Sequence, residues 1–542
     1  MTARVARASN PQGTTAMWVR DRLDGLWCDE DFAAWYPRDG RPGLSPAQLA
    51  TVCVLQFLLN LSDRQAAEAV RCRLDFKYAL GLELDDPGFH HSVLGDFRDR
   101  LAQGDRADQL LDLALARLAA AGLVKQRGRQ RTDSTHVLAA ARDLTRLELV
   151  LEAVRAALEE LARDAPELLD PLVTAEWAER YGRLVRLCSQ PSHPIARLTE
   201  AGADAHALLA LARTRAPDRA TSPAREVLRQ ILVQQFIVDE RGRLRPRADK
   251  DGFPPGARQI RSPYDLETRF ALRGNTRWSG YLLHVTETCD SDRPNVITDV
   301  ATTVPTRDTA AVPGIHTRLN KRCLLPAEHL LDGGYLSVAL LDQADRTYGV
   351  TLIGPVKASG QWQHKKQTGF ARDDFTIDFA NRQVTCPRGQ ATKSWVEAPA
   401  QAPYIAARFR PRHCDPCPAR SSCARGRAAR TVYFLPQQLH ELQARNRADQ
   451  QDPAWRRLYA VRSGVEGTIA ELARGHRARR CRYHGLPKTH VQHVLTAIAV
   501  NIERLTEQDP QNATHRPRRP TAFQQYLVSH GFPRPLWWRQ GK

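Results

Sequence analysis

Residues 327–337, AEHLLDGGYLS, set a short apolar run before an acid and two glycines, a pattern typical of a strand that ends at Asp332. A helix is predicted to follow from about Ser337 to Asp345, and another strand from Tyr348 to Val356. A strand, a helix and a second strand in this order predict an α/β fold.

Two other stretches place acids in comparable settings. Asp133 lies in RQRTDSTHV, residues 129–137, at a short predicted strand, and Glu466 lies in YAVRSGVEGTI, residues 459–469, on a predicted helix. Two Asp on strands and one Glu on a helix, far apart in sequence, form a donor set for two divalent cations. Such a pair of cations serves phosphoryl transfer on nucleic acid.

The composition of the chain points to a polyanionic partner. Lys and Arg number 79 against 60 Asp and Glu, which gives a formal charge of +19 and a pI near 9.8. DNA or RNA is the partner that such an excess favours. The alternative is a general basic background, because much of the charge is Arg scattered through helices rich in Ala and Leu.

Other features of the composition indicate in which cellular compartment the protein is expected. No run approaches the ~20 apolar residues of a membrane span, and the N-terminus lacks an apolar signal core. The 11 cysteines are an odd number and mostly scattered, which favours reduced thiols over a disulfide framework. We therefore expect a cytoplasmic, nucleoid-associated protein with no membrane partner.

Patterning and length predict several domains. The expected divisions are an N-terminal helical, DNA-binding domain over 1–128; a catalytic domain over 129–138, 264–357 and 453–508; a helical insertion over 139–263; a Cys/Arg-rich insertion over 358–452; and a basic tail over 509–542. In the N-terminal domain, Ser45 before Pro46 and also Ser62 are predicted helix N-caps. A plain helical bundle is the alternative to DNA binding there.

The catalytic divisions carry the strand signals. Residues 280–288, GYLLHVTET, and 295–304, NVITDVATTV, flank a polar turn and predict a hairpin. Together with the strands at Asp133 and Asp332 they predict a mixed sheet flanked by helices. The last long helix is predicted to bury one stripe, which comprises Val491, Val494, Leu495, Ile498, Ile502 and Leu505.

The helix around Glu466 presents its acid beside two other functional side chains. At about 100° per residue, Tyr459, Arg462 and Glu466 share one face. Ser463 and Gly464 weaken the turn before the acid, so Tyr459 and Arg462 could belong to a preceding turn. The alternative for Arg462 and Glu466 is a solvated surface ion pair.

One group of cysteines is organised. Cys386 lies in TCPRG, and Cys414, Cys417 and Cys423 follow with the spacing C-x2-C-x5-C. Four thiols with this spacing are candidates for a tetrahedral zinc site, and a reduced cluster without metal is the alternative. Arginines flank the cluster, so the segment is also a candidate DNA-contact surface.

The motifs TDSTHV, LLDGGY and YAVRSGVEGTI, in this order, resemble the DDE-type transposases of bacterial insertion sequences. These enzymes belong to the ribonuclease H-like recombinase superfamily, and the resemblance is to the group with a Tyr, Arg, Glu, Lys signature. The similarity runs from about Leu44 to Leu505. It implies a ribonuclease H-like mixed sheet with an N-terminal helical domain and two insertions.

The resemblance also implies roles for individual residues. Asp133, Asp332 and Glu466 stand where the family has its catalytic, metal-binding acids, and Tyr459 and Arg462 stand where it has DNA contacts. The signature Lys is absent, because Ala473 stands seven residues after the Glu. Arg474 or Arg477 is a candidate substitute for it. The basic stretch after the Glu suits phosphate contacts, or else is a solvated basic face, and it comprises Arg474, Arg477, Arg479, Arg480, Arg482 and Lys488.

The implied activity is DNA transposition by two-metal phosphoryl transfer, with Mg²⁺ or Mn²⁺ as cofactor. The implied partners are the element ends and target DNA, and pairing of two ends implies a dimer or larger assembly on DNA. Two alternatives stay open: an inactive or domesticated transposase that binds DNA as a regulator, and a metal-dependent nuclease that cuts without joining.

A few aromatic residues near the predicted strands carry weaker signals of their own. Trp278 is a candidate either for the core or for stacking on an unpaired base. His136, His284 and His329 lie beside or within strands and are expected to shape the site without a catalytic role.

Overall fold

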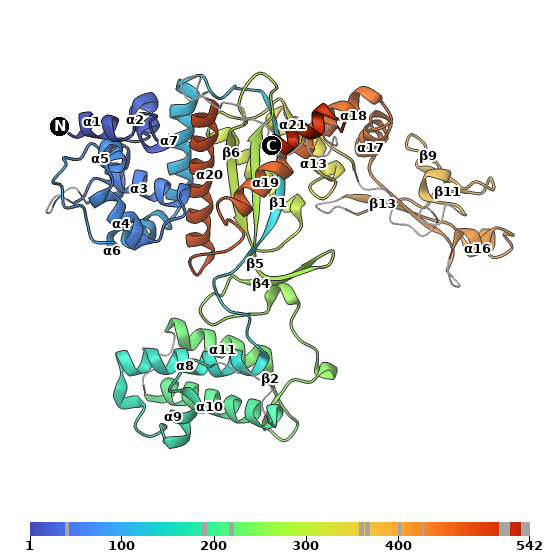
Figure 1. Ribbon diagram of the computed structural model, residues 1–542. Coiled ribbons are helices and arrows are strands. Elements are labelled where there is room, and N and C mark those ends of the chain that lie inside the picture. The colour runs from blue at the N-terminus through green and yellow to red at the C-terminus, as the bar shows by residue number, and fades with distance from the viewer. Residues whose placement is uncertain are drawn as a thin grey trace.

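A mixed sheet lies between two groups of helices, and two further bodies extend from it in the computed structural model (Figure 1). The structure describes the chain except for residues 38, 40–42, 186–191, 216–221, 357–362, 364–368, 399–402, 425–427, 509–520 and 533–542. Most of the predicted basic tail therefore lies outside the described residues. Within that tail the structure describes helix α21 (Ala522–Ser529).

The central sheet has six strands: five lie in the order β6-β5-β1-β7-β8, and the sixth, β4, pairs with the first part of β5. The strands are β1 (Arg129–Leu138), β4 (Arg269–Arg273), β5 (Thr276–Thr288), β6 (Ile297–Thr303), β7 (Glu328–Leu331) and β8 (Thr351–Ile353). The pairs of β5 with β1, β4 and β6 are antiparallel, whereas β1, β7 and β8 run parallel. This order, with helices on both sides, is the ribonuclease H-like arrangement, and the predicted fold class is confirmed.

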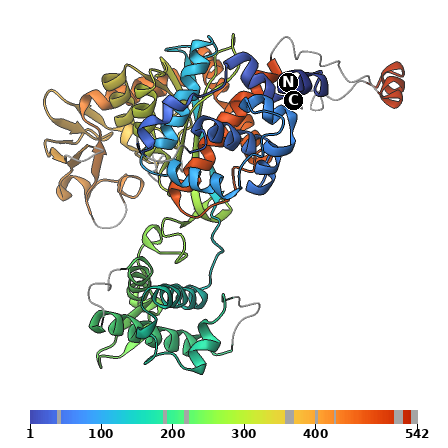
Figure 2. The same ribbon diagram turned by 90° about the vertical axis from the view of Figure 1, so that its left-hand side faces the viewer.

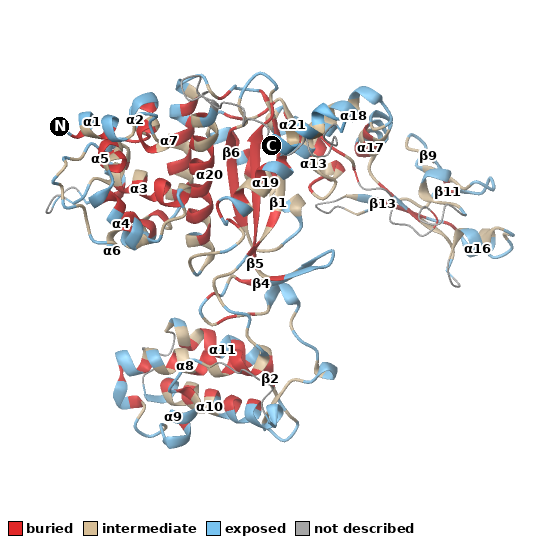
Figure 3. Cartoon of the chain, viewed as in Figure 1, coloured by how far each residue is buried: buried red, intermediate tan, exposed pale blue. Residues whose placement is uncertain are grey.

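Helices cover both faces of the sheet, which is why its strands are buried almost continuously rather than alternately (Figure 3). The covering helices are α7 (Arg106–Ala120), α12 (Val312–Lys321), α13 (Val338–Tyr348), α19 (Val465–Arg474) and α20 (Leu486–Gln508). The stripe predicted on α20 is buried. This helix packs between β6 and the N-terminal helices α3 and α7.

The N-terminal part is a set of short helices around one core that is continuous with the sheet. They are α1 (Thr2–Ser9), α2 (Thr15–Leu23), α3 (Pro46–Leu58), α4 (Asp63–Cys72), α5 (Leu74–Leu80) and α6 (Ser92–Leu101). The predicted N-caps are confirmed, because the Ser45 hydroxyl accepts from Gln48 N–H and the Ser62 hydroxyl from Gln65 N–H. Helices α1 and α2 were not anticipated from the sequence pattern.

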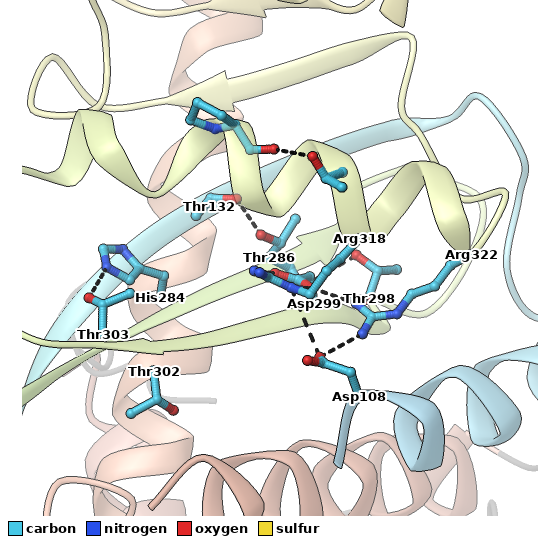
Figure 4. A network of polar contacts seen from close by, with 12 residues as sticks. Asp108, Thr132, His284, Thr286, Thr298, Asp299, Thr302, Thr303, Arg318 and Arg322 are labelled. Atoms are coloured by element: carbon cyan, nitrogen blue, oxygen red, sulfur yellow. Dashed lines mark hydrogen bonds and ion pairs between the residues drawn. The ribbon is translucent and has the colours of Figure 1, made fainter. Parts of the chain in front are cut away.

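A buried ionic network ties the N-terminal helices to the sheet (Figure 4). Arg322, at the end of α12, binds Asp299 of β6 and also Asp108 and Asp112 of α7, while Arg318 makes a bidentate pair with Asp299. Burial tends to raise the pKa of Asp108, but His490 and the two arginines lower it to about 2. The Asp108 carboxylate is therefore held ionised, and α7 is fixed on the sheet edge.

A second helical body is inserted between β1 and β4 and lies below the sheet (Figure 2). It comprises α8 (Arg146–Asp164), α9 (Ala175–Tyr181), α10 (Pro194–Arg215) and α11 (Pro223–Gln235), with a small hairpin of β2 (Phe236–Val238) and β3 (Leu244–Pro246). Its apolar side chains form a cluster of their own. The helical character predicted for this stretch agrees with the structure apart from the hairpin.

The segment after β8 forms two small antiparallel sheets, which differs from the weak pattern seen in its sequence. The strands are β9 (Thr376–Asp378), β10 (Gln383–Thr385), β11 (Ala391–Thr392), β12 (Val396–Ala398), β13 (Tyr404–Arg408) and β14 (Thr431–Phe434). The helices are α15 (Pro411–Cys414), α16 (Arg420–Cys423), α17 (Gln437–Asp449) and α18 (Pro453–Ala460). Strands this short give no readable periodicity.

None of the described helices is long and apolar enough to cross a membrane.

Candidate active site

Asp133 lies on β1, and Asp332 directly follows β7, the parallel neighbour of β1. Thr132 of β1 pairs in register with Leu331 of β7, so Asp133 and Asp332, which follow them, lie next to each other on the sheet. Asp332 directly follows the last residue of β7, close to the predicted strand end, whereas β1 continues beyond Asp133 to Leu138. Both acids are partly buried.

The charge of Asp332 affects the ionisation of Asp133. Burial raises the pKa of the Asp133 carboxyl, and the negative charge of Asp332 raises it further. A hydrogen bond from the Ser134 N–H to Asp133 Oδ1, at 2.7 Å, acts in the opposite direction, as do Arg462 and Arg273. Two neighbouring carboxylates of like charge favour a bound cation, because a cation removes the repulsion between them.

Glu466 reaches this pair through an arginine. It lies in the first turn of α19, after α18 and the 3-10 turn Val461–Gly464, so the helix is interrupted as Ser463 and Gly464 suggested. Arg462 Nη1 donates to Asp133 Oδ2 at 3.2 Å, and its Nη2 donates to Glu466 Oε1 at 2.9 Å. The two predicted acids are therefore joined by the predicted arginine, although the Glu466 side chain remains 64% exposed.

Tyr459 lies beside the same group. Its ring stacks on Trp455 with 5.0 Å between centroids. Burial raises the pKa of the Tyr459 hydroxyl, Arg462 opposes this, and the charges of Asp332 and Asp133 add to the rise. Tyr459 is thus near Arg462, Asp133 and Asp332, and Arg462 links Asp133 to Glu466.

Two residues at the site were missed from the sequence. Arg273 of β4 donates to Ser134 Oγ at 2.8 Å, and its Nη2 lies 3.4 Å from Asp308 Oδ2 and 3.9 Å from Asp332 Oδ2. Asp308 opens the short 3-10 helix Asp308–Ala310 that leads into α12. The strand that carries Arg273 has two exposed apolar residues, Phe270 and Leu272, and its sequence does not alternate between apolar and polar residues. It was therefore difficult to predict as a strand.

Two of the three histidines near the strands, His284 and His329, are buried, and His136 is partly buried. His284 contacts Tyr335 Oη at 2.6 Å and Thr303 Oγ1 at 3.1 Å, and burial lowers its pKa to about 4. His329 contacts Thr132 Oγ1 at 2.7 Å, and burial holds its pKa well below the usual range. Trp278 is buried, and its indole N–H donates to Tyr281 O, which favours the core alternative for this residue.

The basic stretch after Glu466 divides into two groups. Arg479 donates to Thr135 Oγ1, Arg482 to the carbonyl of Leu61, and Lys488 pairs with Asp99, so these three hold the structure together. The other three arginines of the stretch, Arg474, Arg477 and Arg480, are exposed, and their side chains make no hydrogen bond or ion pair with the residues that the structure describes.

Among the residues that the structure describes, no three His, Cys, Asp or Glu side chains are grouped closely enough to hold a metal ion. Arg462 and Arg273 lie between the acids instead. The donor chemistry nevertheless fits a hard divalent cation, since Asp133, Asp332 and Glu466 offer only carboxylate oxygens.

Two parts of the chain match family models of known proteins. Residues 385–506 match the family model described as a transposase DDE domain, and residues 5–100 match the model described as a transposase domain (DUF772). The first match includes Glu466 and all four clustered cysteines, but neither Asp133 nor Asp332. No curated protein and no solved structure matches the chain.

The fold and the two matches define the class of protein as a transposase. The chain carries an N-terminal transposase domain followed by a transposase DDE domain, and DNA transposition is the activity that these domains imply.

Proposed function

We propose that this transposase cleaves the ends of a mobile element to free 3′-hydroxyl groups and then joins them to target DNA, and that Asp133, Asp332 and Glu466 are its catalytic acids. The observation that carries the proposal is the pairing of β1 with β7. It puts Asp133 and Asp332 side by side, while Arg462 links Asp133 to Glu466.

The three acids would hold the divalent cations of the reaction, Mg²⁺ or Mn²⁺. When bound, such ions supply Lewis-acid stabilisation of the charge that develops on the phosphate. The chain itself supplies the alignment of the acids. Arg462 fixes Asp133 relative to Glu466, and Arg273 lies between Asp332 and Asp308, so carboxylates of like charge are kept together.

The DNA is proposed to approach over α19. Three exposed arginines, Arg474, Arg477 and Arg480, follow Glu466 in the sequence. Their guanidinium groups suit contacts with phosphate oxygens. Tyr459 is proposed to contact the DNA beside the acids. Alignment of two element ends would need two active sites, so we propose that the protein acts as a dimer or larger assembly on DNA.

The test is cleavage and joining of DNA that carries the terminal repeats flanking this gene, with Mg²⁺ or Mn²⁺. Asp133→Asn, Asp332→Asn and Glu466→Gln are each expected to lower cleavage by at least about a hundredfold, a loss typical of removing charge stabilisation from a transition state. DNA affinity should stay within a few-fold of wild type. Glu328→Gln is the matched control, because this acid lies at the other end of β7 and pairs with Arg129.

Each outcome decides one part of the proposal. Cleavage retained in any of the three variants removes that residue from the catalytic set. Cleavage without a joined product makes the protein a nuclease, and specific DNA binding without turnover makes it a regulator.

A further inference from the structure

Four cysteines that the proposed chemistry does not use line one small pocket. The pocket has a volume of about 40 Å³ and lies in the β-rich segment near α16, away from the sheet that carries the acids (Figure 1). The thiols are Cys386, Cys414, Cys417 and Cys423, and all four are free. We propose that they bind one structural Zn²⁺ ion as an all-thiolate site.

Two tight turns of the backbone hold three of the thiols, Cys386 in one and Cys414 and Cys417 in the other. After β10, the Cys386 N–H donates to Gln390 O at 2.8 Å, and the Gly389 N–H donates back to Cys386 O at 2.8 Å. Gly389 has φ +79°, a conformation that glycine adopts without strain. At the other side of the pocket, the Cys417 N–H donates to Cys414 O at 3.2 Å, which closes the C-x2-C turn after α15. Thiols in two such turns line a shared pocket from different elements.

The fourth thiol is fixed from two directions. The carbonyl of Cys423 accepts from Arg430 Nη1 at 2.9 Å and from Gln363 Nε2 at 2.9 Å. The end of α16 is therefore held at the pocket before any ion binds. In the structure no three of these sulfurs are close enough together to hold a metal ion, so zinc binding would require side-chain rotations that bring the sulfurs to the roughly 3.8 Å separation set by Zn–S bonds of about 2.3 Å.

The other lining residues suit an anionic metal centre. Arg388, Arg420 and Arg430 line the pocket, and their charges offset the net negative charge of a zinc ion with four thiolates. The buried Nδ1 of His413, which also lines the pocket, has no hydrogen-bond partner among the described residues. An N–H at this position would donate to a zinc-bound sulfur, as outer groups around metal sites commonly do.

The size of the surrounding core gives an independent reason for a metal. Seven buried residues form this core: Phe375, Val384, Ile405, Ala407, Phe409, Val432 and Phe434. The strands around it have two to five residues each. So small a core seldom suffices by itself, and small segments of this kind are commonly held by a metal or by disulfides. Soft thiolate ligands select Zn²⁺ over Mg²⁺, and the thiol protons pass to solvent on binding.

The test is the metal content of the full-length protein, purified without a histidine tag and under reducing conditions. Wild type is expected to carry about one zinc per chain. The double variant Cys414→Ser, Cys417→Ser should carry at least tenfold less, and the matched control Cys28→Ser, Cys323→Ser, which changes two exposed cysteines, should keep its zinc. Replacing zinc by Co²⁺ should give a sulfur-to-cobalt absorption band in wild type and in the control alone.

A second measurement avoids the risk that the double variant fails to fold. Removing zinc from wild type with a chelator should increase proteolysis within residues 370–434, and adding zinc back should reverse it. Zinc absent from wild type, or retained in the double variant, overturns the proposal. Because Asp133→Asn should keep its zinc, failure of the proposed transposition chemistry and failure of the zinc site are distinguishable.

Discussion

The buried carboxylate of Glu287 is expected to hold the helix of Glu466 on the sheet without taking part in the chemistry. It lies on β5 with no exposed surface. Its Oε1 accepts from Arg131 of β1, and its Oε2 accepts from Thr468 of α19 at 2.6 Å and from Arg504 of α20 at 2.9 Å. One carboxylate thus joins two strands of the sheet to two helices.

Changing Glu287 to Gln keeps the shape of the side chain but removes the charge that two nearly buried arginines share. Removal of one partner of a buried ion pair costs about 3–5 kcal/mol, and Gln still offers one acceptor, so we expect a loss near the lower end, about 3 kcal/mol. For a domain of this size such a loss lowers the melting temperature by roughly 6–12 °C. Cleavage should fall at temperatures where the wild type still works, because α19 is no longer fixed.

The assay is urea and thermal unfolding followed by DNA cleavage at a low temperature and at one near the new midpoint. Glu466→Gln is the matched control, since substitution of an exposed acid should abolish cleavage with little change in stability. Thr468→Val is a milder second variant, with an expected loss of about 1.5–3 kcal/mol for its hydrogen bond to a charged group. A change below about 0.5 kcal/mol in Glu287→Gln would refute the reasoning.

The same region yields three shorter predictions. In Gly464→Ala the new Cβ would overlap the Arg131 guanidinium, so we expect a loss of about 1–3 kcal/mol and reduced cleavage, whereas Gly467→Ala, whose Cβ meets open space, should be neutral or stabilising in unfolding assays. Arg462→Lys replaces a fork by a single ammonium, so cleavage should fall about tenfold or more in a single-turnover assay; wild-type rates would show that the bridge has no role. Burial lowers the pKa of His284 to about 4, so as the pH falls the imidazole is protonated in the unfolded state before it is protonated in the folded state. The contribution of the neutral His284 to the free energy of unfolding is therefore complete above about pH 6.5 and should fall by roughly 1.4 kcal/mol per pH unit toward pH 4. A urea midpoint that does not change over this range would contradict the lowered pKa of His284.

Several parts of the fold could be predicted because their signals are local. The caps Ser45 and Ser62 and the buried stripe of α20 follow from capping chemistry and from the 3.6-residue period, which a single segment displays by itself. The hairpin of β5 and β6 could also be predicted, because a polar turn separates its two strands. The short strands β9 to β14 were not, since two to five residues do not establish a period.

The candidate site shows the same division. The sequence singled out Asp133, Asp332 and Glu466 as acids in settings that suit metal binding, and the order of the motifs indicated a transposase. The pairing of β1 with β7 brings Asp133 beside Asp332, and Arg462, which lies in the turn before the helix of Glu466, joins Asp133 to Glu466. The catalytic roles of these residues stay predictions for the cleavage assay.

The sequence by itself determined the class of fold, the helices with strong periods and the residues worth testing. Only the tertiary structure decided that Arg273 and Asp308 join the acids, that Glu287 secures α19, and that four cysteines line one pocket. The physical reason is that capping and periodicity are properties of neighbouring residues. Contacts between distant segments depend instead on strand order and register, which are set by how the whole chain buries its apolar surface.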